Sequence, residues 1–114
     1  MDPSRARPLL VAVTNNLMDQ SRFEAAGASV GYHVEFVRSA AVGTVDPVVA
    51  FVDLEAPGAD GAISDLAGRG VRVIAYGPHV DDLGMVRAHA LGAAAAEPRS
   101  RVLTNLAEFL PPVV

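Results

Sequence analysis

The sequence predicts an α/β domain in which a five-stranded parallel sheet is covered by helices on both faces. Five short apolar runs alternate with helix-type segments along the 114 residues. Strands that are covered on both faces read as nearly continuous apolar runs, and strand–helix alternation favours parallel pairing through right-handed crossovers. A chain of this length has the usual size of one domain, so we expect residues 1–114 to form a single domain with flexible tails at 1–7 and 111–114.

The five predicted strands differ in the strength of their signal. The first four are rich in Val, Leu, Ile or Phe, whereas the fifth contains only alanine and is accepted from its place in the alternation. The predicted strands are Leu9–Thr14, His33–Arg38, Val48–Leu54, Val71–Tyr76 and Ala93–Ala96.

Capping residues and stop signals predict the helices between these strands. Asn16 is suited to cap a helix that runs to about Ala28. The later helices are predicted at Ala59–Arg69, from a cap at Asp81 or Asp82 to about Leu91, and from a cap at Ser100 to just before Pro111. The last helix places Val102, Leu106, Phe109 and Leu110 on one face, which indicates core packing. The segment Ala40–Asp46 is short and contains Gly43, so we expect a single turn or a loop there.

Composition excludes several classes of chemistry. The chain has no cysteine, which excludes disulfides, thiolate metal sites and cysteine nucleophiles. All nine basic residues are arginine, so no Schiff-base or P-loop lysine is present. These arginines are scattered and the net charge is −4, which argues against nucleic acid as a partner. The apolar runs are too short for a membrane span or a signal-peptide core, so we expect a cytoplasmic protein.

A short set of polar, glycine and proline residues stands at the carboxyl ends of four predicted strands. In open parallel sheets, ligands and reactive groups lie beyond these ends. The residues concerned are Thr14, Asn15, Asn16, Asp53, Gly77, Pro78, His79, Asp81, Glu97, Pro98, Arg99 and Ser100. We therefore expect any functional pocket at this edge of the sheet.

The run Asp53-Leu54-Glu55-Ala56-Pro57-Gly58 resembles the phospho-acceptor loop of response-regulator receiver domains, in which an aspartate closes an apolar strand and Pro-Gly follows four and five positions later. The resemblance covers nearly the whole chain. It implies a flavodoxin-like, receiver-like three-layer sandwich with strand order 2-1-3-4-5 and Asp53 at the carboxyl edge of the central strand.

The chain departs from the receiver pattern at three places. Where the family has acidic residues that hold Mg²⁺, this sequence has Asn15 and Asn16; where it has Thr or Ser, this sequence has Gly77; and where it has Lys-Pro, this sequence has Glu97-Pro98. Mg²⁺ prefers anionic oxygens, and a phosphorylated aspartate needs cations to offset its charge. These residues and Asp53 therefore form a degenerate phospho-acceptor pocket, and we interpret the chain as a non-catalytic pseudo-receiver without a metal or cofactor.

Two alternatives to the pseudo-receiver remain open. The first is a small-ligand or anion sensor that uses the strand-end pocket with Asn15, Asn16, Asp53, His79, Arg99 and Ser100. The second is a degenerate receiver that is still phosphorylated on Asp53. We favour a structural role for Asp53, which would close a turn or pair with Arg99.

The loop from Gly77 to Asp81 carries a second pair of candidate residues. His79 and Asp81 have the chemistry of a metal pair, a proton-transfer pair or a pH-sensitive contact. Two ligands make an incomplete metal site. We favour a turn at Gly77-Pro78, a helix cap at Asp81, and a hydrogen bond from His79 to the backbone or to Asp53.

The resemblance also implies where a partner would bind. In receivers, the face built from the fourth helix, fifth strand and fifth helix often contacts another protein or a second copy. The candidate exposed residues on this face are Met85, His89, Arg101, Asn105 and Glu108.

Overall fold

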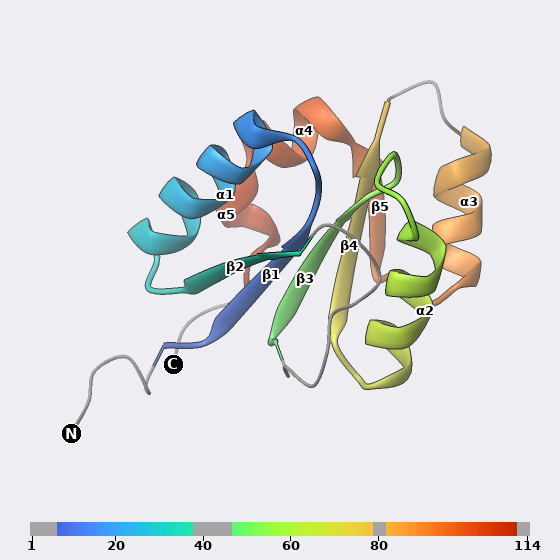
Figure 1. The fold of residues 1–114 in the computed structure, drawn as a ribbon, viewed down its shortest axis with the longest axis horizontal. Coiled ribbons are helices and arrows are strands. Elements are labelled where there is room, and N and C mark those ends of the chain that lie inside the picture. The colour runs from blue at the N-terminus through green and yellow to red at the C-terminus, as the bar shows by residue number, and fades with distance from the viewer. Residues whose placement is uncertain (1–6, 38–46, 79–81, 112–114) are drawn as a thin grey trace.

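A five-stranded parallel sheet forms the centre of the molecule. The computed structural model describes residues 7–37, 47–78 and 82–111. The strand order is β2-β1-β3-β4-β5, which confirms the predicted order 2-1-3-4-5 and the flavodoxin-like architecture (Figure 1). The strands are β1 (Leu9–Val13), β2 (His33–Val37), β3 (Val49–Asp53), β4 (Arg72–Gly77) and β5 (Ala95–Pro98).

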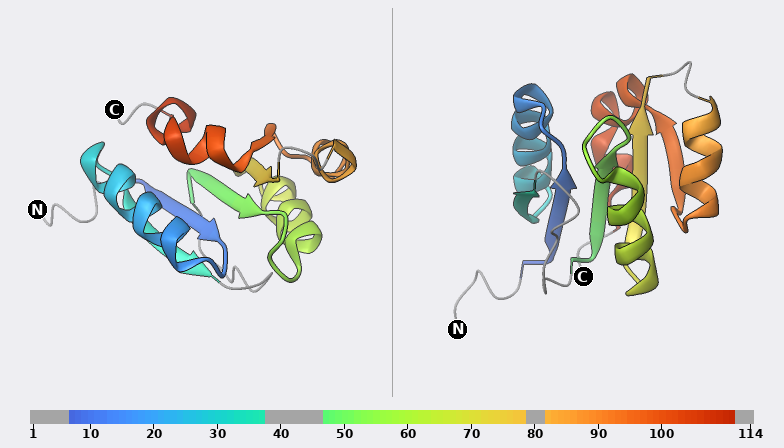
Figure 2. Two further views of the ribbon diagram at one scale, coloured as in Figure 1. Left: turned by 90° about the horizontal axis from the view of Figure 1, so that it is seen from above. Right: turned by 45° about the vertical axis from the view of Figure 1, so that its right-hand side comes forward.

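Helices cover both faces of the sheet. The helices of the described ranges are α1 (Leu17–Ser29), α2 (Ala59–Gly68), α3 (Asp82–Ala90), α4 (Arg99–Thr104) and α5 (Leu106–Phe109). Helices α1, α4 and α5 lie on one face and α2 and α3 lie on the other (Figure 2). The predicted turn or loop at 40–46 and the predicted cap at Asp81 lie outside the described residues.

The central strand β3 separates two apolar layers. All five of its residues are buried, and successive side chains point to opposite faces. Phe51 contributes to the layer under α1, where its ring lies 4.9 Å from that of Phe23, while Ala50 and Val52 contribute to the layer under α2. A strand that is buried on both faces explains the continuous apolar run in the sequence.

The fifth strand starts later than the sequence predicts. Ala93 is not in the strand, because its N–H donates to the carbonyl of Ala88 and completes the end of α3. Gly92 has a φ of 113°, a conformation that favours glycine and turns the chain towards β5. The strand therefore runs from Ala95 to Pro98 and includes Glu97.

The prediction of the last helix is wrong in two respects. The observed helix α4 begins at Arg99 after Pro98, so Ser100 lies inside α4 and does not cap it. It is also interrupted at Asn105, whose backbone and side-chain N–H groups both donate to the carbonyl of Arg101. A side chain that competes for backbone hydrogen bonds ends a helix, and the chain restarts as α5. The predicted inward face is confirmed, since its four residues all belong to the layer under α1.

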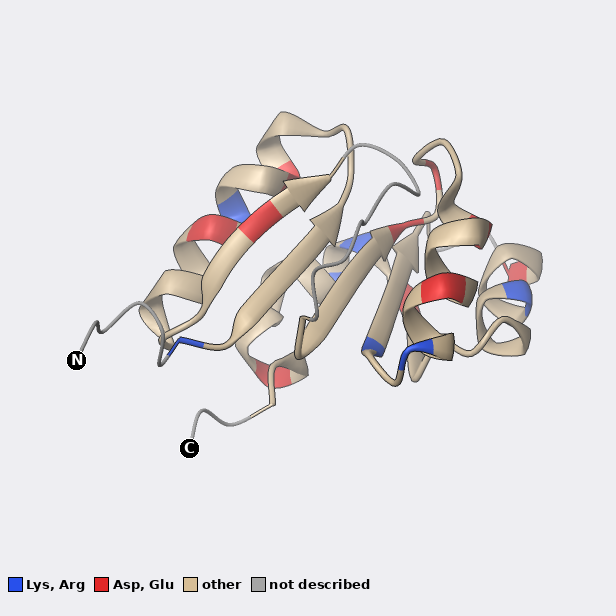
Figure 3. Ribbon diagram, turned by 60° about the horizontal axis from the view of Figure 1, so that its bottom comes forward, with Lys and Arg blue, Asp and Glu red and all other residues tan. Residues whose placement is uncertain are grey.

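Among the described residues, the arginines do not form a single basic face. Figure 3 shows arginines interspersed with acidic residues on the ribbon. Over the described ranges, none of the helices combines the length and the apolar character that crossing a bilayer requires.

Two glycines allow a matched test of the packing between α1 and β2. A Cβ on Gly27 would lie 2.5 Å from Cγ2 of Val34, whereas a Cβ on Gly68 would meet nothing within 4 Å. We expect Gly27→Ala to lower the free energy of unfolding by about 1–3 kcal/mol, because overpacking strains the helix–sheet contact. The control Gly68→Ala should be neutral or stabilising by up to about 1 kcal/mol. Urea denaturation measures both, and equal stabilities would contradict the observed packing.

Candidate functional site

Asp53 is buried at the carboxyl edge of the sheet, at the end of β3, where the sequence predicts it. Only 6% of its side chain is exposed, and both carboxylate oxygens accept hydrogen bonds. Oδ1 accepts from the backbone N–H of Glu55 at 2.9 Å. Oδ2 accepts from the hydroxyl of Thr14 at 3.2 Å and from Nη2 of Arg99 at 2.9 Å. The predicted pairing of Asp53 with Arg99 is therefore present.

A second buried carboxylate, Asp19, belongs to the same cluster and was not predicted. Its Oδ2 accepts from the hydroxyl of Tyr76 at 3.0 Å and from Nη1 of Arg99. Asn16 caps α1 as predicted, because its Oδ1 accepts from the N–H groups of Met18 and Asp19 and orients the first turn. The signal in the sequence was the spacing of four residues between Asp19 and the apolar Phe23, because residues four apart lie on the same face of a helix.

Arg99 joins the two carboxylates. It is the first residue of α4, and its guanidinium donates to Asp19 with one amino group and to Asp53 with the other. Its Cζ also lies 5.1 Å from the centre of the Tyr76 ring. Burial alone would lower the pKa of Arg99, but the hydrogen bonds and charges of Asp53 and Asp19 raise it above its ordinary value. Arg99 therefore stays protonated and supplies the positive charge between the two carboxylates.

Neutral donors supply the remaining hydrogen bonds of this carboxylate cluster, which we define as Thr14, Asp19, Asp53, Tyr76 and Arg99. Two buried carboxylates share one guanidinium, so the hydroxyls of Thr14 and Tyr76 complete their hydrogen bonding. Burial raises the pKa of Tyr76 far above its ordinary value, and the negative charges of Asp19 and Asp53 raise it further. Tyr76 therefore remains a donor to Asp19 throughout the physiological pH range.

The cluster fits a guanidinium and does not fit Mg²⁺. A divalent ion between Asp19 and Asp53 would have to displace Arg99 from both carboxylates. Asn16 uses its side-chain oxygen to cap α1, and Asn15 is exposed. Within residues 7–37, 47–78 and 82–111, no group of three His, Asp or Glu side chains is placed to hold a metal ion.

Two predicted pocket residues do not contact the carboxylate cluster. Glu97 was expected to add negative charge beside Asp53, but its carboxylate lies 3.7 Å from Nε of Arg101, one turn along. Ser100 is exposed on α4. Gly77 ends β4, and a Cβ there would lie 3.2 Å from Cδ1 of Leu54, so little room exists for a side chain. His79 and Asp81 lie outside the described residues.

The predicted interaction residues flank β5 on opposite faces of the sheet. Met85 and His89 are on α3, and Arg101 is on α4. His89, Arg101 and Glu108 are exposed as predicted. Met85 and Asn105 are only partly exposed.

Solved structures identify the fold. A CheY-like response regulator receiver domain protein from Methanospirillum hungatei JF-1 superposes with a TM-score of 0.78 and 15% identity, over 90% of this chain and 89% of that one. A response regulator from Thermotoga maritima gives 0.73 and 16%, over 90% and 92%. The phosphorylated cyanobacterial phytochrome response regulator RcpA gives 0.73 and 15%, over 90% and 87%. The chain is a receiver-like domain in its fold.

Neither a protein-family model nor a curated protein sequence matches the chain.

The bridge made by Arg99 has a measurable effect on stability. We expect Arg99→Gln to lower the free energy of unfolding by about 3 kcal/mol, because it leaves two carboxylates buried without their cation. The matched control is Arg101→Gln, two positions along on the same helix. The side chain of Arg101 is 63% exposed, and its Nε lies 3.7 Å from the carboxylate of Glu97. Arg101→Gln should therefore change the free energy of unfolding by no more than about 0.5 kcal/mol. Chemical denaturation that finds equal effects for the two variants would rule out the bridge as a stabilising contact.

Tyr76 should make the fold sensitive to alkaline pH. Its pKa in the folded state is raised above the ordinary value of 10.0, so its contribution to stability is complete below pH 10 and is lost as the pH rises further. In Tyr76→Phe we expect a smaller alkaline loss of unfolding free energy, measured in urea between about pH 8 and 11. The control Tyr32→Phe removes the other tyrosine, whose hydroxyl donates to the carbonyl of Pro111. This variant should still show the alkaline loss of unfolding free energy that Tyr76 causes. An unchanged pH profile in Tyr76→Phe would contradict this assignment.

Proposed function

We propose that the chain is a pseudo-receiver: a non-catalytic regulatory module that acts through protein contacts and is not phosphorylated on Asp53. The observation that carries this proposal is the guanidinium of Arg99 between Asp19 and Asp53. A receiver aspartate must present a free carboxylate oxygen to a phosphoryl donor. In this chain both oxygens of Asp53 are engaged, and one of them is held by a charged group on the same chain.

The electrostatics also disfavour a phosphoryl group at this position. Transfer to Asp53 would add negative charge beside Asp19, which is buried and hydrogen-bonded to the same guanidinium. Phosphoryl transfer depends on cations placed around the transferred group. Arg99 already balances two carboxylates, the chain contains no lysine, and Gly77 offers no hydroxyl.

We propose that partner recognition uses the face around β5, formed by α3, β5 and α4. Leu83 and Val86 on α3 are 79% and 67% exposed, and they lie on one side of the helix at a spacing of three residues. Exposed apolar side chains of this size favour contact with another protein or a second copy of the chain. Arg101 and His89 provide polar groups at the rim of this face.

We place this activity in the cytoplasm. The absence of cysteine from the whole sequence is compatible with a reducing compartment.

Treatment with a phosphoryl donor tests the proposal directly. Acetyl phosphate or beryllofluoride with millimolar Mg²⁺ should neither modify Asp53 nor shift the backbone amide signals of the wild-type chain. The control variant Asp53→Asn cannot form the adduct, so treatment should leave its own amide spectrum and its own intact mass unchanged. A stoichiometric adduct in the wild type that Asp53→Asn lacks would establish a working receiver and overturn the pseudo-receiver proposal.

Substitution of one exposed leucine tests the binding face. We expect Leu83→Ser to reduce recovery of partner proteins, or self-association, at least several-fold with no loss of thermal stability. The matched control is Leu17→Ser on α1, where the side chain is 74% exposed. Affinity capture with quantitative mass spectrometry and sedimentation velocity measure the two outcomes. Equal effects of the two substitutions would show that binding does not use the face around β5.

A further inference from the structure

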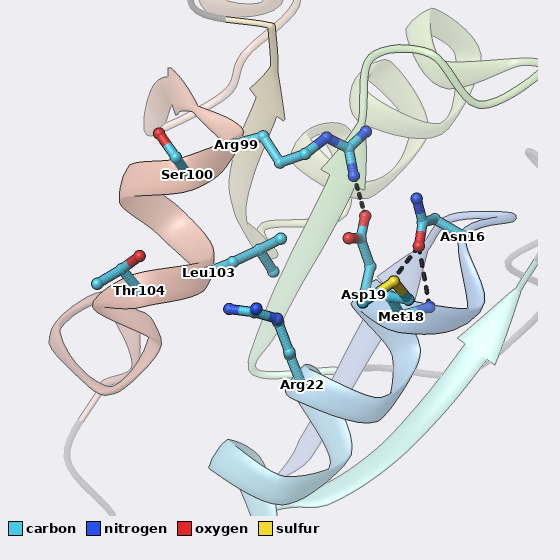
Figure 4. A pocket seen from close by; sticks show the side chains of 8 residues that line it. All are labelled: Asn16, Met18, Asp19, Arg22, Arg99, Ser100, Leu103 and Thr104. Atoms are coloured by element: carbon cyan, nitrogen blue, oxygen red, sulfur yellow. Dashed lines mark hydrogen bonds and ion pairs between the residues drawn. The ribbon is translucent and has the colours of Figure 1, made fainter.

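A groove of about 350 Å³ lies between α1 and α4, beside the carboxylate cluster (Figure 4). Its volume falls at the lower end of the range found for small-molecule sites. Helix α1 contributes Met18 and Arg22 to the lining, and α4 contributes Ser100, Leu103 and Thr104. The groove shares α4 with the proposed partner face around β5, but its lining does not include Leu83, Val86 or Arg101.

Hydrogen-bond donors predominate in this groove. Arg22 is exposed and extends from α1 towards α4, and it has no ion pair or hydrogen bond with another described residue (Figure 4). The hydroxyls of Ser100 and Thr104 add further donors on α4. The acidic residue of the groove, Asp19, is neutralised by Arg99 and accepts a second hydrogen bond from Tyr76. Arg22 is therefore a cation whose charge no described carboxylate offsets by direct contact.

Apolar surface lies beside these donors. Met18 is 71% exposed at the start of α1, and Leu103 is partly exposed on the facing side of α4. An unbranched methionine adapts its shape to a flat apolar ligand. The groove therefore combines a site for negative charge with a surface for a ring or an alkyl group.

We propose that this groove binds a phosphate-bearing small molecule of the mononucleotide class, with Arg22 as the principal cation. A phosphoryl group presents several acceptor oxygens in different directions, which matches donors that come from two helices. The apolar part of the ligand lies against Met18 and Leu103. This binding activity is additional to the proposed function and does not require Asp53 to be unphosphorylated.

The experiment is a titration of the isotope-labelled full chain with AMP, adenosine and inorganic phosphate at constant ionic strength, followed by amide NMR. We expect AMP to give saturable shifts confined to α1 and α4 and to bind more tightly than either part alone. Arg22→Gln should weaken AMP binding about tenfold or more, the effect of losing a charge-assisted hydrogen bond. The matched control Arg72→Gln removes an exposed arginine at the start of β4, at the opposite edge of the sheet, and should leave binding unchanged.

Several results would overturn the inference. One is the absence of saturable amide shifts with AMP, and another is shifts that lie outside α1 and α4. A third is an equal loss of AMP affinity in Arg22→Gln and Arg72→Gln, which would indicate general attraction to positive charge. Adenosine that binds as tightly as AMP would show that phosphate is not recognised. Inorganic phosphate that binds as tightly as AMP would exclude the contact with Met18 and Leu103. Because Arg22 makes no ion pair or hydrogen bond with another described residue, circular dichroism should confirm that Arg22→Gln is folded.

Discussion

The contact on which the functional edge depends is the bridge that Arg99 makes between two buried carboxylates. Removing Asp19 and Asp53 from water costs several kcal/mol for each charge, and a cation with good hydrogen-bond geometry is required to offset that cost. Arg99 meets the requirement because its planar group donates in two directions at once. The bridge also ties α1, β3 and α4 together, although these elements are far apart in the sequence.

A guanidinium on the chain differs chemically from an exchangeable metal ion. A metal site responds to ion concentration, and its coordination changes when a phosphoryl group arrives. Arg99 is a permanent part of α4, its pKa is raised by its partners, and it holds its charge at every physiological pH. On the proposed function, the receiver fold then serves as a rigid support for surfaces, and regulation passes through what binds to those surfaces.

The two proposed surfaces meet at α4. Leu83 and Val86 of the partner face lie on α3, whereas the groove beside Arg22 lies between α1 and α4 on the other face of the sheet (Figure 2). Arg99 lines the groove and also donates a hydrogen bond to Asp53. A ligand in the groove would therefore affect Asp53 through Arg99. The same residue therefore contributes both to stability and to the shape of the groove.

The sequence by itself determined the α/β class, the first four strands and the position of Asp53, because buried apolar strands and helix caps are local patterns. With the receiver resemblance it also predicted the strand order. It left Arg99 as one of several partners for Asp53, missed Asp19, and did not predict that Glu97 pairs with Arg101. An acidic residue in the first turn of a helix normally faces solvent, and only the tertiary placement of α1 against the sheet brings the side chain of Asp19 to Tyr76 of β4. Which charges meet is decided by the tertiary structure, because side chains from distant elements have to converge on one buried point.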